Sequence, residues 1–543
     1  MFVFLFRQMI IRFYLVILTF LLFSKLSISQ YYNGITRPDY TKKTVVDSLS
    51  QLTTAIDQTE MSTILDVLTS DSCAGRELGS RGIDIAANFI ATKFQQYGIQ
   101  KIGDNNSYFQ HVGFSWVNWE NTSFTANDTE FKLLWDYVAV PTENNDLEIN
   151  AKEIVFCGYG IDDPNYNDYE NTSVKGKVIL IYNGEPTKAD GTSWITNSQF
   201  QSDWSTNFNK KIEAAKKHEV ALILVIEEKF KQLVDLKRSQ LISPTFLLDS
   251  EEYLTSNTPN VAYMSSSTSS HVIGNALKKV IQARNRIKKK GRAHSFSFNT
   301  KLEISQKKNI KAISGKNIMA YFEGTDKKEE IVIVSAHYDH IGKKNEDIFN
   351  GADDNGSGTT AVIQIAKALQ VARDKGIKPR RTILCLLVTG EEKGLLGSNY
   401  YVNNPRLDLN KTTVDINIDM VGRIDKKYSE DSAYLYVIGS DRLSSDLHRI
   451  NEEVNSKYSQ LILDYVYNAE NDPNRYYYRS DHYNFAEKRI PAIFFFNGTH
   501  EDYHRITDDK IKINLPILEK RTKHIFLLTW ELANIPKRII VDK

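Results

Sequence analysis

The chain has 543 residues, of which 41% are hydrophobic and 25% are charged, a balance typical of globular proteins and sufficient for two or three domains. Its 68 Lys and Arg residues nearly balance its 67 Asp and Glu residues, so the charge gives no reason to expect nucleic acid as a partner. Cys73, Cys157 and Cys385 are too few and too far apart for a disulfide framework or a thiolate metal site. We therefore expect buried free thiols.

Residues 1–29 have the features of a secretory signal peptide. Arg7 and Arg12 precede an apolar run at 13–23, and small residues up to Ser29 offer a cleavage site. We therefore predict export to the periplasm or the extracellular medium, with an uncleaved anchor as the alternative. No later segment approaches the roughly 20 apolar residues that a membrane helix needs, so we expect no membrane span after cleavage.

Three patterns follow this leader and predict three parts of the chain. Residues 30–129 contain one clear helical repeat, at 83–96, and form the N-terminal part of the main domain. In residues 130–292, short apolar strands punctuated by glycines, with a helical pattern at 208–217, indicate a smaller, inserted α/β or β-rich module. Residues 293–543 alternate strands and helices and form the rest of the main domain.

The alternation in residues 293–543 predicts an α/β fold with a mixed, largely parallel central sheet and helices on both faces. The expected strands are 331–336, 382–388, 414–420, 434–438 and 492–496, and the expected helices are 358–373 and 443–454. In such sheets, ligands bind beyond the carboxyl ends of the strands. Chemistry is therefore expected at that edge.

Histidines and carboxylates gather where these strands end. The groups are His337-Tyr338-Asp339-His340, Asp353-Asp354, Glu391-Glu392, Asp419 and His504. Each group alone fits an ordinary role as a helix cap, a turn or a solvated charge. Their joint occurrence directly after apolar strands favours a metal site instead. Imidazole and carboxylate ligands without thiolate suit a catalytic zinc.

The same set fits a two-metal centre. Two zinc ions about 3.5–4 Å apart need a bridging carboxylate and further ligands on each side. Because neighbouring residues on an extended segment point in opposite directions, Glu391 and Glu392 can have different roles. One would bind metal, and the other would take a proton from the water molecule that the metal activates.

Six stretches carry a resemblance to a known family. In chain order they are SAHYDHIG (335–342), NGADDNGSG (350–358), TGEEKGLLGS (389–398), NIDMVGR (417–423), RSDHYNF (479–485) and GTHEDYHRITDD (498–509). With them the chain resembles the co-catalytic two-zinc aminopeptidases, a family that also includes glutamate carboxypeptidases and glutaminyl cyclases. Residues 130–292 resemble, more weakly, the protease-associated domain that many members carry as an insertion.

The resemblance implies a zinc exopeptidase-like fold that binds two Zn²⁺ per chain. His337 and Asp419 would bind one zinc, and Glu392 and His504 would bind the other. Asp353 would bridge the two ions.

Further roles follow from the same resemblance. Glu391 would be the general base and then the acid that protonates the leaving amine. Asp339 would hydrogen-bond His337 and orient it, and Asp481 would have a structural or supporting role. The Asp353–Asp354 peptide bond would be cis.

The donor to the oxyanion is expected in the segment before the last strand. Tyr477, Tyr478 and His482 are the candidates, although a tyrosine cluster is more often packing. His340 and His500 are further histidines near the motifs that the ligand set does not need.

The sequence therefore predicts hydrolysis of terminal bonds in peptides or proteins with free ends, and it favours an aminopeptidase. A carboxypeptidase or dipeptidase of the same mechanism, a glutaminyl cyclase, and a non-catalytic receptor or peptide-binding relative stay open. The complete ligand set and the presence of Glu391 disfavour the last two. Side-chain preference and oligomeric state are not indicated.

Overall fold

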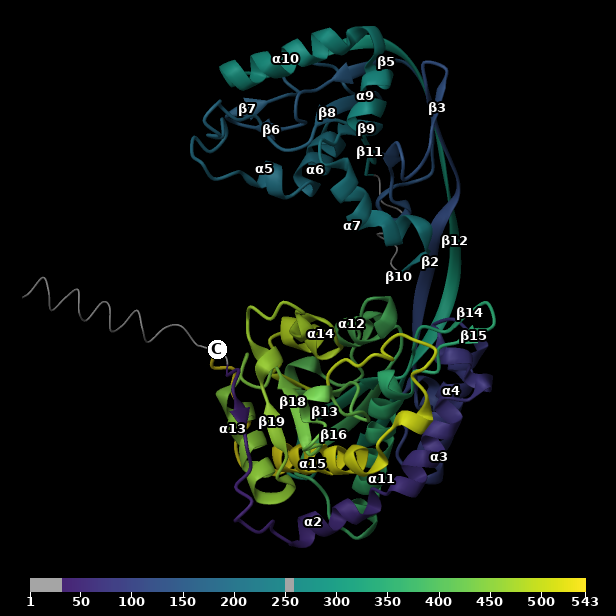
Figure 1. Cartoon of the computed structure of the whole chain (residues 1–543), viewed down its shortest axis with the longest axis vertical. Helices are drawn as coiled ribbons and strands as arrows, with labels where there is room; N and C mark the ends of the chain where they lie inside the picture. Colours follow the sequence, from purple (N-terminus) through teal and green to yellow (C-terminus); the bar gives the residue numbers. More distant parts are fainter. Residues whose placement is uncertain (1–31, 250–257) are drawn as a thin grey trace, which may run out of the picture. The chain divides into compact units, whose positions relative to one another are not determined.

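The computed structural model describes residues 32–249 and 258–543, so the predicted signal peptide lies outside the described residues. The chain divides into two compact units (Figure 1): unit 1 is Met1–Val112 with Ser314–Lys543, and unit 2 is Gly113–Ile313. Unit 2 contains all of the predicted insertion and extends beyond it in both directions. The extra residues belong to two long strands, β2 (Phe109–Ala126) and β12 (Phe296–Phe322), each with residues in both units.

Unit 1 is built on a mixed sheet, as predicted. Its strand order is β1-β19-β18-β20-β17-β13-β16-β12. Strands β16, β13, β17 and β20 run parallel to one another, whereas β12 and β18 run antiparallel to their neighbours β16 and β20. The strands of unit 1 not yet given bounds are β1 (Ile35–Thr36), β13 (Lys327–His337), β16 (Arg381–Val388), β17 (Thr412–Ile418), β18 (Tyr434–Ile438), β19 (Ile462–Asp464) and β20 (Ala492–Phe496).

Helices cover both faces of this sheet because its strands are apolar on both sides. Val332 and Val334 of β13 point into one core, and Ile331 and Ile333 point into another. The first core includes residues of α2 (Ser48–Leu52), α3 (Gln58–Leu68), α4 (Arg81–Gln96), α11 (Gly358–Asp374), α13 (Ser445–Val454) and α15 (Leu515–Asn534). The second includes residues of α12 (Leu396–Asn403) and α14 (His482–Glu487).

Unit 2 has its own set of parallel strands and its own cores. The parallel strands are β5 (Leu147–Phe156), β8 (Val178–Tyr182), β9 (Leu222–Ile226) and β11 (Asn260–Met264), with β4 (Tyr137–Val138) and part of β12 antiparallel at the edges. Helices α6 (Asn209–Lys217) and α10 (Leu277–Lys290) bury apolar side chains against these strands. Helix α6 confirms the helical pattern predicted at 208–217.

All three cysteines are buried and free, as predicted. Across the described ranges, no helix combines the length and the apolar character needed to cross a membrane.

The arrangement that matters most for chemistry is the strand order β17-β13-β16. Because these three strands are adjacent and parallel, their carboxyl ends meet at one edge of the sheet.

Candidate metal centre

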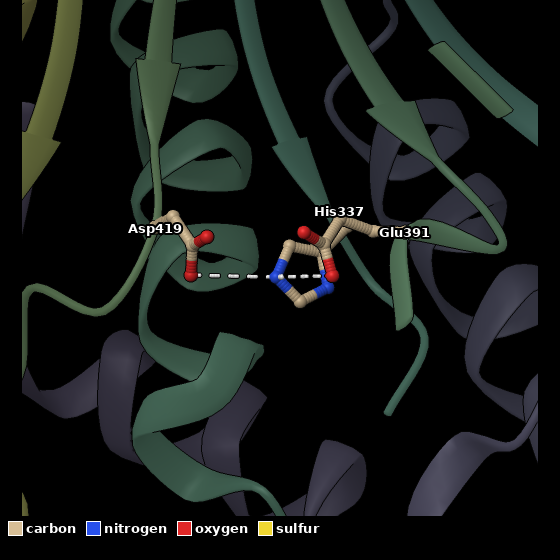
Figure 2. A group of neighbouring side chains, drawn as sticks. All are labelled: His337, Glu391 and Asp419. Atoms are coloured by element: carbon tan, nitrogen blue, oxygen red, sulfur yellow. Dashed lines mark ion pairs between the residues drawn. The ribbon is translucent and has the colours of Figure 1, made fainter. Parts of the chain in front are cut away.

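The ends of the three adjacent strands place one histidine and two carboxylates together. His337 is the last residue of β13, Asp419 directly follows β17, and Glu391 opens the turn η7 (Glu391–Lys393) after β16. Figure 2 shows dashed lines from the His337 ring to both carboxylates, which mark ion pairs. His337 Nε2 lies 3.3 Å from Asp419 Oδ1 and 3.9 Å from Glu391 Oε2.

A second cluster adjoins the first and comes from loops. Asp354, in the turn η6 (Ala352–Ser357) before α11, places Oδ2 3.1 Å from His504 Nε2. Glu392 places Oε2 3.2 Å from the same nitrogen and Oε1 2.8 Å from His340 Nδ1. The Oδ1 atom of Asp354 lies 3.5 Å from His337 Nε2, which joins the two clusters.

These distances separate ligand pairs from other contacts. Two ligands about 2.0–2.2 Å from one tetrahedral zinc lie roughly 3.3 Å apart. His337 has that spacing to Asp419 and Asp354, and His504 has it to Asp354 and Glu392. The two oxygens of Asp354 thus face different histidines, which is the arrangement of a bridging carboxylate.

The structure brings the Asp354 carboxylate between the two histidines, and not that of Asp353, which the sequence predicted as the bridge. The Asp353 carboxylate turns away from the ligands: its Oδ1 accepts from Gly422 N at 2.7 Å, and its Oδ2 accepts from Asn497 Nδ2 at 3.0 Å and lies 3.1 Å from His500 Nε2. The prediction of a cis Asp353–Asp354 peptide is also wrong by one residue, because the cis bond joins Asp354 and Asn355.

The donor atoms at the strand ends fit a metal. The Nε2 atom of His337, the Oδ2 atom of Asp354 and the Oδ1 atom of Asp419 are buried and have no hydrogen-bond partner among the described residues. Buried polar atoms are rarely left unpaired, and here they converge on the same space. Imidazole and carboxylate donors in this arrangement suit Zn²⁺.

The charge on the histidines supports the same assignment. Burial opposes protonation of His337, but the carboxylates of Glu391 and Asp419 raise its pKa well above the usual value. Burial likewise opposes protonation of His504, yet the nearby carboxylates of Asp354 and Glu392 raise its pKa to about 10. The protein therefore attracts positive charge to both positions, and a divalent cation would replace the protons there.

Glu391 and Glu392 are neighbours with opposite electrostatics. Burial raises the pKa of Glu391 well above the usual range, and the charges of Glu392 and Asp419 add to this effect, while His337 opposes it. Burial also disfavours ionisation of Glu392, but the neighbouring His340 and His504 hold its pKa well below the usual range. The surroundings thus favour the protonated form of Glu391 and the ionised form of Glu392.

Asp339, at the end of β13, supports the centre in a different way from the one expected. The atom that lies 3.1 Å from His337 Nδ1 is its backbone oxygen, and its carboxylate is 3.8 Å away at the nearest. That carboxylate accepts from the backbone N–H groups of Glu391 and Glu392 at 3.1 and 3.3 Å. Asp339 thus holds the turn that carries both glutamates.

Asp481 is buried beside the centre without joining it. It stands at the N-cap position of helix α14 without a side-chain hydrogen bond to the helix, and its carboxylate accepts a hydrogen bond from Ser398 Oγ. Burial raises its pKa to about 7, although His337 opposes the shift. The neighbouring Ser480 donates from Oγ to Asp419 Oδ2 at 2.8 Å, and so orients a ligand. The sequence interpretation did not single out Ser480.

The predicted oxyanion residues do not line the pocket over the ligands. Tyr477 packs beneath the Arg442 guanidinium, 4.4 Å from its ring centroid, and contacts the His482 ring. His482 is buried and stacks on Phe494, and burial lowers its pKa to about 3. Tyr478 packs against Tyr483.

A different set of side chains lines that pocket together with the carboxylates. They are Met420, Tyr476, Arg479, Phe494, Phe496, Thr499, Tyr503 and His504. The Tyr503 ring stacks on His504 at 4.0 Å, and Arg479 Nη2 donates to the Tyr503 hydroxyl at 3.2 Å. In the sequence, Tyr503 directly precedes His504, and this position was the one indication that Tyr503 lies at the site.

Arg76, in the loop before α4, is a further residue that the sequence interpretation did not assign. Its guanidinium is fully buried and donates to four backbone carbonyls, those of Leu68, Tyr338, Asn350 and Gly351. Two of these segments carry ligands, because Tyr338 follows His337 and Gly351 precedes Asp354. Arg76 thus ties the N-terminal segment to the loops of the metal centre.

Comparison with known proteins places this centre among peptidases. Residues 317–529 match the model of Peptidase family M28. The chain is 37% identical over 105 residues to Aminopeptidase YwaD of Bacillus subtilis (strain 168), covering 19% of this chain and 21% of that protein. It is 26% identical over 265 residues to Leupeptin-inactivating enzyme 1 of Streptomyces exfoliatus, covering 45% and 54%.

A solved structure extends the likeness of fold over most of the chain. An aminopeptidase from Aneurinibacillus sp. strain AM-1 superposes with a TM-score of 0.50 at 17% identity and covers 91% of this chain and 98% of that one. At this identity the likeness concerns the fold alone. The chain spans about a fifth and about half of the lengths of the two curated relatives named above.

Proposed function

Because residues 317–529 match the model of Peptidase family M28, we propose that this chain is an exported zinc-dependent exopeptidase that removes residues from the free amino end of peptides. The observation that carries the proposal is the bridging geometry of Asp354, whose two oxygens face His337 and His504 at 3.5 and 3.1 Å. His337, Asp419 and Asp354 would hold one Zn²⁺, and Glu392, His504 and Asp354 the other.

Held in this way, the two ions would act as Lewis acids toward a water molecule and the peptide carbonyl. The protein supplies the proton transfers. Glu391 lies beside His337 but outside ligand spacing, at 3.9 Å, and its raised pKa suits a group that must take and return a proton. Glu391 would accept a proton from the attacking water and deliver it to the leaving amine nitrogen.

Tyr503 is our candidate for the donor that stabilises the developing oxyanion. It lines the pocket beside His504, and its hydroxyl accepts a hydrogen bond from Arg479. The phenolic hydrogen is therefore available to a substrate oxygen. A fixed donor of this kind strengthens binding as negative charge develops in the transition state.

The pocket supports an amino-terminal preference. Glu391 and Asp419 line it and would attract the ammonium group of a free amino end, while Met420, Phe494 and Phe496 form an apolar wall. We expect large apolar terminal residues to fit this wall. One of the two curated relatives named above, YwaD of Bacillus subtilis (strain 168), is called an aminopeptidase.

One observation favours the second candidate, a carboxypeptidase or dipeptidase of the same mechanism. The exposed side chain of Arg479 lines the same pocket and could pair with a substrate carboxylate. A glutaminyl cyclase or a receptor is less well supported, because both metal positions and Glu391 are present.

Two parts of the proposal concern the rest of the chain. Export depends on residues 1–29, which have the signal-peptide pattern. Unit 2 would be the protease-associated-like insertion, and its position between two segments of unit 1 is consistent with that.

The decisive experiment measures zinc content and peptidase activity together, in the wild type and in Glu391→Gln. We expect about two zincs per chain in both proteins, cleavage of peptides with a free amino end but not of N-acetylated ones, and a loss of about 10²–10⁴-fold in kcat in the variant. Cleavage restricted to free carboxyl ends would support the second candidate. A zinc-free, inactive wild type would refute the enzyme assignment.

A further inference from the structure

The proposed function requires Glu391 and Glu392, two neighbours in one short turn, to perform different tasks. Nothing in their chemical identity separates them, so the surroundings must. We propose that His340 is the positioning residue that makes this distinction: it holds one oxygen of Glu392 and leaves the other for the second metal. This inference rests on the proposed function and concerns how its metal centre is assembled.

The first support is the contact itself. His340 Nδ1 lies 2.8 Å from Glu392 Oε1. An ionised carboxylate can only accept, so Nδ1 is the donor. The distance is that of a charge-assisted hydrogen bond, about 2.7–2.9 Å. It is shorter than the roughly 3.3 Å that separates two ligands of one zinc.

The distance from His340 to Asp354 also differs from the spacing of two ligands of one zinc. Its Nδ1 lies 3.7 Å from Asp354 Oδ2, whereas His504 Nε2 lies 3.1 Å from the same atom. His340, Asp354 and Glu392 do form a group that could hold a metal ion. The distances, however, favour His504 as the ligand and His340 as the residue that orients Glu392.

The second support is how tightly the ring is held. His340 is fully buried, and its backbone N–H donates to Arg76 O at 3.2 Å. Its ring packs against Gly351, where an added Cβ would come within 2.5 Å of His340 Cδ2. Gly351 also has a φ of +55°, in the region that favours glycine. The position of the ring is therefore built into the fold.

The third support is the contrast with Glu391. No hydrogen bond to the Glu391 carboxylate occurs among the described residues, and its nearest histidine nitrogen is that of His337 at 3.9 Å. The Glu392 carboxylate, by contrast, is held at Oε1 by His340, with Oε2 3.2 Å from His504 Nε2. One glutamate is fixed for ligation, and the other stays free to move a proton.

The test compares His340→Asn with His340→Leu, two side chains of similar shape. The Asn amide can donate from nearly the position of Nδ1, whereas Leu cannot donate at all. We would measure zinc per chain and the dissociation constant of each zinc, using buffered Zn²⁺ on the full chain. Far-UV circular dichroism and thermal melting would establish that both variants are folded.

We expect His340→Leu to keep the first zinc and to bind the second about 10–100-fold more weakly, as is typical when a residue that orients a ligand is removed. His340→Asn should retain the wild-type affinity for both. Loss of the second zinc in both variants would mean that His340 is itself a ligand, and unchanged affinity in both would remove its role. Either result overturns the inference. A wild type without zinc would instead refute the proposed function.

Discussion

Units 1 and 2 both contain adjacent parallel strands, and both bury charged side chains beyond the carboxyl ends of those strands. In unit 2 these charges are fully paired. Asp168 accepts from Tyr159 N at 2.8 Å, Ile161 N at 3.2 Å and the Tyr166 hydroxyl at 2.7 Å. Lys211 of α6 donates to the backbone oxygens of Tyr159 and Gly184. Such groups hold loops in place.

In unit 1, the buried charged side chains beyond the carboxyl ends of the parallel strands differ from those of unit 2 in their hydrogen bonding. His337 Nε2, Asp354 Oδ2 and Asp419 Oδ1 are buried and make no hydrogen bond among the described residues, and they lie within ion-pair distance of neighbouring acids or imidazoles. A buried polar group without a hydrogen bond is costly, because it has lost its water without gaining a full partner. Several such groups at one point therefore indicate a cation site. The comparison teaches that the hydrogen bonding of buried charges, and not their presence, distinguishes a site from a structural support.

The strongest way to break this comparison is to remove Asp354, the carboxylate that joins both clusters. Asp354→Asn should reduce zinc content below two per chain and abolish activity, a larger loss than the 10²–10⁴-fold expected for the base alone. Zinc content by elemental analysis and kcat with a free-amine peptide substrate would check this.

Asp353→Asn is the matched control, because this neighbouring carboxylate is paired with Gly422 N, Asn497 and His500. It should keep both zincs and lose stability instead. If Asp353→Asn lost the zinc and Asp354→Asn kept it, the bridge would return to the position that the sequence predicted.

Asp353 and Asp354 also show which parts of the site could be predicted from the sequence and which could not. The strands β13, β16, β17 and β20 could be predicted because their apolar runs are uninterrupted, and parallel strands bring the following residues to one edge. The direction of each side chain in the turn η6 could not be predicted, because the backbone of this turn is irregular. Asp354, for example, has φ −99° and ψ 97°. Two adjacent aspartates in such a turn are indistinguishable by pattern alone.

The boundaries of unit 2 were missed for a related reason. Strand β12 runs for 27 residues, and its middle is polar and partly exposed, as at Lys307, Lys308 and Lys311. Its apolar signal is therefore too weak to indicate a strand. Tyr503 was not assigned because its place beside His504 was its one signal in the sequence, and its stacking on His504 and its contact with Arg479 appear only in the structure.

A smaller effect should separate the pocket tyrosine from the packed one. Tyr503→Phe removes the proposed oxyanion donor but keeps the ring that stacks on His504, so we expect a loss of about 10²–10³-fold in kcat with little change in KM. Tyr477→Phe, outside the pocket lining, should leave kcat almost unchanged. Steady-state kinetics with unchanged zinc content would decide, and the reverse ranking would restore the donor that the sequence predicted.

The smallest effect is expected in unit 2, and it should appear in stability and not in catalysis. Burial raises the pKa of Asp168 to about 6 from an ordinary value of 3.8, although the Tyr166 hydroxyl and two backbone N–H groups oppose the shift. Between these two pH values the folded protein binds more protons at this residue than the unfolded chain does. The contribution of Asp168 to the free energy of unfolding is therefore full below about pH 4 and is lost as the pH rises to 6.

Asp168→Asn cannot ionise, so its free energy of unfolding should lack this fall between pH 4 and 6, while the lost hydrogen bonds lower it by a constant amount. Five of the six tryptophans, Trp116, Trp119, Trp135, Trp194 and Trp204, lie in unit 2, so urea unfolding followed by tryptophan fluorescence reports on this unit. The kcat of the folded variant should equal that of the wild type. A parallel pH dependence in the two proteins would show that the Asp168 carboxylate is not perturbed, and a loss of kcat would show that a paired charge in unit 2 nevertheless serves the site.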